Sequence, residues 1–406
     1  MNYTLYGDGI HDDTAAIQEL IDSSSHELSL PMPKDKYIIS KPLELPSDFC
    51  FTLPRYAEIK LAAGSDCVMI KNKTLDDYKK RLRDHLHVGF FINSYSPDYK
   101  CRNIKLCGGI WNFNNMEQTP NPMQSPNPDW SRNYSGLGML FYVVDGLHIS
   151  DMTLKDPVTF AIILDTVSNF TVENLVFDFN YGNPIAVNMD GVHVDGNCHH
   201  GVIRNLKGAC YDDMVALNAD EGSDGPISDI EVSGIHALDS HSAVRLLTVK
   251  HRLSNIHIHD IYGTYYQYCI GLTKYYDLSD NTGCFDSISI DHIYASKAVR
   301  LPVFQQHMKG CENFHFPMIQ IESGTNSNNI TIDTFHRCET ANPIDTVRID
   351  KDAQVNRLVL RNISVENHTG KPISKFANHG IIKNLYVSEM EKDDIENYGT
   401  IENMIM

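Results

Sequence analysis

Two neighbouring carboxylates stand at the start of an alternating apolar run in the stretch ACYDDMVALN, residues 209–218. These are Asp212 and Asp213, and a third carboxylate, Asp190, opens the similar run DGVHVDG. Like charges held this close resist joint ionisation, so the pKa of one of them rises. A protonated carboxyl beside an ionised one suits glycoside hydrolysis, in which one group protonates the leaving oxygen and the other activates water or attacks the sugar.

The two runs align by their apolar residues, and the pattern recurs in SAVRLLT at 242 and YCIGLTK at 268. If each run is a strand on a successive coil, neighbouring strands lie about 4.8 Å apart. Asp190 and Asp213 then occupy one rung, with Asp212 one residue before it. Strict alternation would point Asp213 inward, where an unpaired carboxylate is costly. We therefore expect a bend or bulge that turns the carboxylates outward.

The residues between the apolar positions predict what surrounds the carboxylates. The outward positions of the aligned runs carry His193, Ala216, Arg245 and Gly271. His241 begins the coil that follows the Asp-Asp pair, which brings it close to the carboxylate rung. Two small residues beside a histidine and an arginine predict a floor over which a ligand can lie.

A repeated phrase predicts the elements that position these residues. It consists of alternating apolar residues followed by Asn, Asp or His, and it runs from DGLHISDM at 145 to NHGIIKNL at 378 in steps of 22 to 42 residues. Alternation indicates strands, and a period of this length indicates a solenoid or a propeller. The steps vary too much for propeller blades, and no amphipathic helix separates the strands. We therefore expect an all-β fold, a parallel β-helix.

The ends of the chain differ from the repeats. The segment DDTAAIQELIDSS predicts a short helix with Asp13 as its N-cap and Ala16, Ile17, Leu20 and Ile21 on one face, which would cap the open first coil. We expect one domain over residues 1–406. Its parts are a cap with first strands (1–65), loop-rich excursions with a second short helix at 75–86 (66–136), regular coils (137–390) and an acidic tail (391–406).

The composition limits the classes of partner that the protein is expected to bind. The net charge is −18, from 34 Lys and Arg against 52 Asp and Glu, which argues against nucleic acid as a partner. No long apolar run is present, so we expect no membrane partner. The start lacks a secretory signal, which predicts a cytoplasmic protein, or a secreted one if a signal was removed. Ten scattered cysteines without a CxxC predict reduced thiols and neither a metal nor a cofactor.

The motifs resemble those of the polygalacturonase family of glycoside hydrolases over about residues 6–275. The family's Asn-Thr-Asp motif is similar to NMDG at 188–191, its Asp-Asp motif to DDMVAL at 212–217, and its Gly-His-Gly motif to DSHSAV, which keeps only His241. GGIWNFN at 108 and YGDGIHDDTAAIQ at the start are also similar to family segments. The resemblance implies a right-handed β-helix that cleaves pectic polymers with inversion.

The resemblance also implies roles for the site residues. Asp212 would be the general acid, while Asp190 and Asp213 would hold and deprotonate the attacking water. His241 would tune the acid by hydrogen bonding.

One departure concerns the family's Arg-Ile-Lys motif, which grips the uronate carboxylate. The corresponding stretch here is GLTKYY, in which only Lys274 could bind that carboxylate. Arg245 is a second candidate for this contact, because its planar guanidinium suits carboxylates. The expected substrate-binding residues are therefore Asn188, His193, His241, Arg245 and Lys274.

The hydrolase we expect acts on an α-linked galacturonide or a related sugar, from one end of the chain, with a carbohydrate as its partner and homo-oligomerisation left open. Two alternatives use the same fold. A polysaccharide lyase would bind Ca²⁺ at the acidic rung, with Arg245 as its base. A non-enzymatic β-helix would bind sugar without cleaving it.

Overall fold

The computed structural model describes residues 3–73, 101–121, 136–179, 188–274, 281–299 and 315–406. They form two compact units, residues 1–202 with 221–223 and residues 203–220 with 224–406. The single domain expected over 1–406 stays a prediction, and the helix expected at 75–86 lies outside the described residues. Within the described ranges, no helix has the length and apolar character needed to cross a membrane.

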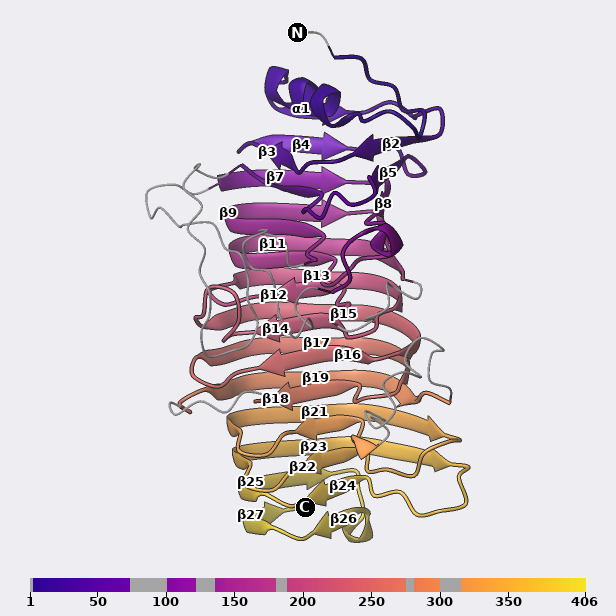
Figure 1. Ribbon diagram of the computed structural model, residues 1–406. Coiled ribbons are helices and arrows are strands. Elements are labelled where there is room, and N and C mark those ends of the chain that lie inside the picture. The colour runs from indigo at the N-terminus through magenta and orange to yellow at the C-terminus, as the bar shows by residue number, and fades with distance from the viewer. Residues whose placement is uncertain (1–2, 74–100, 122–135, 180–187, 275–280, 300–314) are drawn as a thin grey trace. The chain divides into compact units, whose positions relative to one another are not determined.

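In its described residues, the first unit is a stack of parallel strands that follows a helix near the N-terminus (Figure 1). Its elements are α1 (Thr14–Ser23), β1 (Glu27–Ser29), β2 (Lys36–Ile39), β3 (Leu43–Leu45), β4 (Phe49–Thr52), β5 (Glu58–Leu61), β6 (Ile70–Asn72), β7 (Cys101–Cys107), β8 (Ile110–Asn112), the 3₁₀ turn η1 (Asn115–Glu117), β9 (Met139–Ser150), β10 (Thr153–Lys155), β11 (Ile162–Asp178) and β12 (Val192–Val194). Three of the strands, β6 to β8, lie within the segment expected to form loop-rich excursions.

The second unit has two parallel sheets, whose strands alternate along the chain. Strand β13 (His199–Ala209) leads into it from the first unit. One sheet contains β15 (Ile227–Ser240), β17 (Arg252–Tyr265), β19 (Cys284–Lys297), β21 (Asn326–Glu339), β23 (Gln354–Asn367), β25 (Ile381–Ser388) and β27 (Thr400–Ile405). The other contains β14 (Asp213–Asn218), β16 (Ser242–Leu247), β18 (Ile270–Thr273), β20 (Ile319–Ile321), β22 (Val347–Ile349), β24 (Phe376–Asn378) and β26 (Ile395–Asn397), with the 3₁₀ turn η6 (Lys392–Asp394) before β26.

This alternation of parallel strands confirms the parallel β-helix with an N-terminal helix. The acidic tail expected at 391–406 adds β26 and β27 to the two sheets, where they pair with β24 and β25. The helix α1 contacts β1 and β3, so it covers the start of the first unit as expected.

Two details of the helix differ from expectation. Leu20 is exposed, while Ala16, Ile17 and Ile21 are buried. Asp13 stands at the N-cap position but makes no side-chain cap bond. Its carboxylate instead accepts hydrogen bonds from the backbone amides of Tyr6 and Gly7, so it fastens the segment before the helix.

The polar residues of the repeated phrase bend each long strand. Two residues with positive φ, five positions apart, recur in successive coils, and their side chains are mostly those that tolerate the left-handed region. The pairs are Asn169 and Asn174, His200 and Asn205, Asp229 and Gly234, Asn255 and Asp260, and Ser287 and His292. Because the bends recur in register, their side chains meet, as where Asn255 Nδ2 donates to Asp229 Oδ1 at 3.0 Å.

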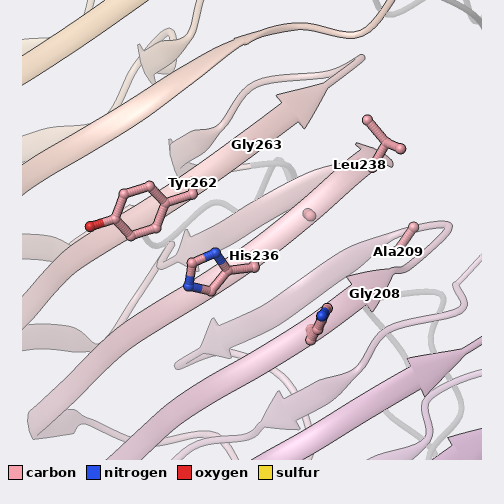
Figure 2. Close-up of a pocket in the computed structure, with 8 residues that line it drawn as sticks. Gly208, Ala209, His236, Leu238, Tyr262 and Gly263 are labelled. Carbon is pink, nitrogen blue, oxygen red and sulfur yellow. The ribbon is translucent and has the colours of Figure 1, made fainter.

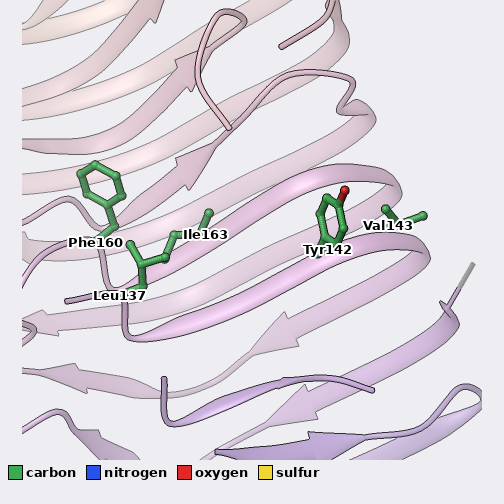
Figure 3. Packing of buried hydrophobic residues seen from close by; sticks show 5 residues of the cluster. All are labelled: Leu137, Tyr142, Val143, Phe160 and Ile163. Carbon is green, nitrogen blue, oxygen red and sulfur yellow. The ribbon is translucent and has the colours of Figure 1, made fainter. Parts of the chain in front are cut away.

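Apolar side chains fill the interior between the bends. In the second unit Ile230, Ile256, Ile288, Ile330 and Leu358 stack one above another through the parallel register. In the first unit a buried cluster forms from Leu137, Tyr142, Val143, Phe160 and Ile163 (Figure 3). Phe160 of this cluster also packs on a buried histidine of the candidate site.

The left-handed bends generate a prediction about stability. Asn255 has φ 54°, so Asn255→Val places a β-branched residue where it is strained and should lower the free energy of unfolding by about 1–3 kcal/mol. Asn255→Gly also loses the bond to Asp229 but fits the bend, so it should cost less. Urea unfolding of both variants checks this, and equal losses would show that the hydrogen bond, and not the backbone, controls the bend.

Candidate active site

One cluster of the second unit contains the Asp-Asp pair. Asp212 directly precedes β14, and the parallel pairing of β14 with β16 sets Asp213 opposite Ser242 and Ala216 opposite Arg245. The long Arg245 side chain reaches back along the strand. Its Nε lies 2.9 Å from Asp213 Oδ2, and its Nη2 lies 3.4 Å from Asp212 Oδ1. One guanidinium therefore contacts both carboxylates.

His241 completes this cluster from the turn before β16. Its Nδ1 lies 3.3 Å from Asp212 Oδ1, and its ring meets that of Tyr266 edge-on at 5.1 Å. His241 and Arg245 thus both contact the same oxygen of Asp212. Its side chain stays 16 % exposed, so it is the carboxylate that a ligand can reach.

The environment of Asp213 corrects the expectation that the carboxylates turn outward into solvent. Its side chain is only 1 % exposed. The burial is balanced by pairing, because Arg245 contacts one oxygen and the Ser242 hydroxyl donates to the other. The alternation does break at this point, since Asp213 meets Arg245, whose own rung lies three residues further along β14. Asp213 is therefore buried, and its negative charge is paired with Arg245.

The expected floor beside Arg245 is filled by an aromatic ring. A Cβ at Gly271 would lie 2.6 Å from the ring of Tyr268, so the glycine makes room for that ring. The Tyr268 hydroxyl lies 2.8 Å from Arg245 Nε, and Phe316 packs edge-on against its ring. Burial raises the pKa of Tyr268 well above its ordinary value, so the hydroxyl stays neutral. Sequence reasoning missed Tyr268 as the residue that fixes Arg245.

A second cluster lies in the first unit, around His193. His193 was expected on an open floor, but it is only 1 % exposed and is enclosed by carboxylates. Its Nδ1 lies 2.7 Å from Asp190 Oδ2, while its Nε2 lies 3.0 Å from Glu221 Oε2 and 3.3 Å from Asp195 Oδ1. Its ring stacks on Phe160 with centroids 3.9 Å apart. His193 therefore holds Asp190 in place and presents no ring face to solvent.

Burial and neighbouring carboxylates set the pKa values of the groups in and beside this cluster. Burial works against a charged ring, but hydrogen bonds with Asp190, Asp195 and Glu221 outweigh it and raise the pKa of His193 well above its ordinary value. Neighbouring Asp165 is also buried. Burial and the negative charge of Asp195 raise the pKa of its carboxyl group. Sequence reasoning missed Asp195 and Glu221, whose only signals were the second Asp of DGVHVDG and the acidic stretch NADEGSD.

Both clusters bring together atoms of the kind that bind metals. Donor atoms of Asp212, Asp213 and His241 lie within 4.8 Å of one another. Those of His193, Asp195 and Glu221 do the same. Either set is close enough to share one cation, so the metal-free site expected from sequence stays a prediction that chelation can check.

The two remaining predicted residues lie outside the strands. Asn188 has φ 58° and accepts a hydrogen bond from Asn121 Nδ2 at 3.3 Å. Lys274 follows β18, and its backbone amide donates to Glu322 Oε2 at 2.6 Å. The structure thus groups Asp212, Asp213, His241 and Arg245 in one unit and Asp190 with His193 in the other.

Comparison with solved structures shows the fold. An endo-xylogalacturonan hydrolase from Aspergillus tubingensis matches over 98 % of this chain and 97 % of its own, with a TM-score of 0.62 and 15 % identity. A tailspike protein double mutant of E. coli bacteriophage HK620 matches over 95 % of this chain and 68 % of its own, with a TM-score of 0.62 and 12 % identity. A Streptococcus pneumoniae surface protein and adhesin matches over 100 % and 98 %, with a TM-score of 0.58 and 13 % identity.

These identities are low, so the matches establish the β-helix and no more. No protein-family model matches the chain, and no curated protein matches its sequence. The similar structures include a hydrolase and an adhesin by name. The fold is therefore compatible with both cleavage and binding, and the chemistry must be argued from the side chains.

The raised pKa of Asp165 generates a prediction about pH. A carboxyl group whose pKa is higher in the folded state contributes stability below its unfolded pKa and loses it as pH rises through the folded value. Asp165→Asn removes this loss. The free energy of unfolding of the variant, relative to that of the parent, should therefore rise by at least about 1 kcal/mol when the pH is raised from 4 to 8. Urea unfolding at both pH values measures the gain, with the exposed Asp178→Asn as control. A difference that is the same at both pH values would contradict the prediction.

Proposed function

We propose that the chain is a glycoside hydrolase that cleaves an α-linked galacturonide or a related sugar in pectin-type chains. The observation that carries the proposal is the Asp212–Asp213 pair, with His241 and Arg245 in contact with it. Acid-assisted attack of water on a glycosidic bond uses carboxyl groups in unequal surroundings, one protonated and one ionised. The resemblance of the sequence motifs to the polygalacturonase family points to the same chemistry.

The surroundings of the two carboxylates support different tasks. Asp213 is buried against Arg245 and the Ser242 hydroxyl, which favour its ionised form and suit a base. Asp212 is the more accessible, and its contact with His241 offers a partner for proton exchange, so it suits the general acid. Asp190, which His193 contacts at 2.7 Å in the first unit, stays the third predicted carboxylate.

Arg245 enters this mechanism through the carboxylates. The sequence suggested that it grips a uronate, but its Nε and Nη2 are already directed at Asp213, Asp212 and Tyr268. Its first proposed task is therefore to keep Asp213 ionised. Lys274, at the end of β18, remains the candidate for contact with an acidic sugar.

Inversion and action from one chain end complete the proposal. With water attacking opposite the leaving group, an α-linked substrate yields a β-configured reducing end first. Proton NMR of fresh product on pectic oligosaccharides reads the anomer directly, and the pattern of released sizes separates end-wise from internal cleavage.

Asp212→Asn tests the acid. The amide cannot donate the proton, so turnover of the best oligosaccharide substrate should fall by more than ~10²-fold. The melting temperature should stay close to that of the parent, because the side chain is partly exposed. Asp260→Asn, a substitution at a half-exposed left-handed bend, is the matched control and should keep full activity. An Asp212→Asn variant with near-normal turnover would remove this residue from the mechanism.

A lyase is the second candidate, because Asp212, Asp213 and His241 bring donor atoms within 4.8 Å of one another. The hydrolase proposal expects full activity after exhaustive chelation and products without ultraviolet absorbance. Loss of activity in chelator, rescue by Ca²⁺ and an unsaturated product would replace the hydrolase with the lyase.

A further inference from the structure

A column of aromatic rings runs along the outer face of the second unit. The parallel register of β15, β17, β19 and β21 sets His236, Tyr262, Tyr294 and His336 side by side. The rings of His236 and Tyr262 stack at 4.7 Å and those of Tyr262 and Tyr294 at 5.3 Å, each pair within 5° of parallel. His336 is tilted at 6.4 Å from Tyr294.

The column ends at His236, because β15 is the last of these four strands before β13. Figure 2 shows Gly208 and Ala209 on the strand next to that of His236. A cavity of about 460 Å³ opens there, lined by these residues and by Lys207, Leu238 and Tyr262. The outermost ring of the column thus borders a hollow of a size that suits a small ligand.

The backbone shapes this hollow. The pairing of β15 with β17 shifts register between Ala237 and Ser240, which is a bulge of the kind often found beside functional sites. Gly263 has φ 136°, and a Cβ there would lie 2.0 Å from the Ala237 carbonyl oxygen. Only glycine allows the strands to approach in this way. The hollow is therefore built into the frame and does not depend on a side-chain rearrangement.

The lining combines an apolar platform with a cation. The His236 ring and Leu238, which is 74 % exposed, offer the flat and aliphatic surfaces against which the C–H face of a pyranose packs. Lys207 is exposed at the rim and makes no ion pair within the described ranges of the chain. On a chain of net charge −18, such a local cation is what an anionic ligand needs.

We propose that this hollow is a second sugar-binding site, apart from the candidate active site, which takes a uronic-acid residue of a polysaccharide. The ring of His236 carries the sugar face, and Lys207 pairs with the carboxylate. The sugar class rests on the proposed function, but the binding does not rest on catalysis. Strand β15 carries His236 and ends at Ser240, the residue before His241. The proposed sugar site and the Asp212 cluster are therefore connected by one strand.

Direct binding tests the site. The full chain with Asp212→Asn, which stops turnover, is titrated with a galacturonic acid trisaccharide and with the matched galactose trisaccharide, and the Tyr262 ring signals are followed by NMR. The acidic sugar should shift these signals. His236→Ala should weaken that binding by roughly tenfold. His336→Ala, at the other end of the column, is the matched control and should leave it unchanged.

Lys207 tests the ligand class. Lys207→Ala should remove the preference for the acidic sugar, and Lys207→Arg should keep it. The proposal is overturned if neither sugar shifts the Tyr262 signals, if His236→Ala binds like its parent, or if acidic and neutral sugars bind equally. Burial of the column in a dimer, seen by sedimentation, would also overturn it. Binding here without hydrolysis by the wild type would reject the proposed function alone, and hydrolysis without binding here would reject this site alone.

Discussion

Hydrogen bonding between parallel strands of successive coils is the constraint on which the other features depend. It places each residue beside its counterpart on the next coil. Side chains at equivalent positions therefore contact one another, as like residues that stack or as polar residues that hydrogen-bond. The stacked apolar residues, the Asn255–Asp229 bond and the His236–Tyr262–Tyr294 rings are consequences of one register. The left-handed bends preserve that register, because they turn the strand at the same two points in successive coils.

Burial of charge is the second constraint, and it decides which acids can do chemistry. A carboxylate removed from water needs a cation or several donors. Asp213 has Arg245 and Ser242, and Asp190 has His193, so both are held in place. Asp212 keeps contact with solvent. The two adjacent carboxylates therefore differ in exposure, and the proposed roles of base and general acid rest on this difference.

The same frame supports two surfaces of different character in the second unit. The sheet of β14 and β16 carries a compact charged cluster, while the sheet of β15 and β17 carries an aromatic column that ends in a hollow. Both are preformed, since strand pairing and glycines set their shapes. The proposed hydrolase would benefit from such a division, because binding at one surface raises the local concentration of substrate at the other.

The sequence by itself determined the parallel β-helix, its capping helix and the residues Asp190, Asp212, Asp213, His241 and Arg245 as candidates, because alternation and repeat length are local patterns and motif spacing is visible along the chain. Only the tertiary structure decided the directions of the side chains. It enclosed His193 among Asp190, Asp195 and Glu221, placed Tyr268 over Gly271, and turned Arg245 back onto the Asp-Asp pair. These contacts join residues far apart in sequence, and a buried charge takes the partner that packing brings to it, which no strand pattern specifies.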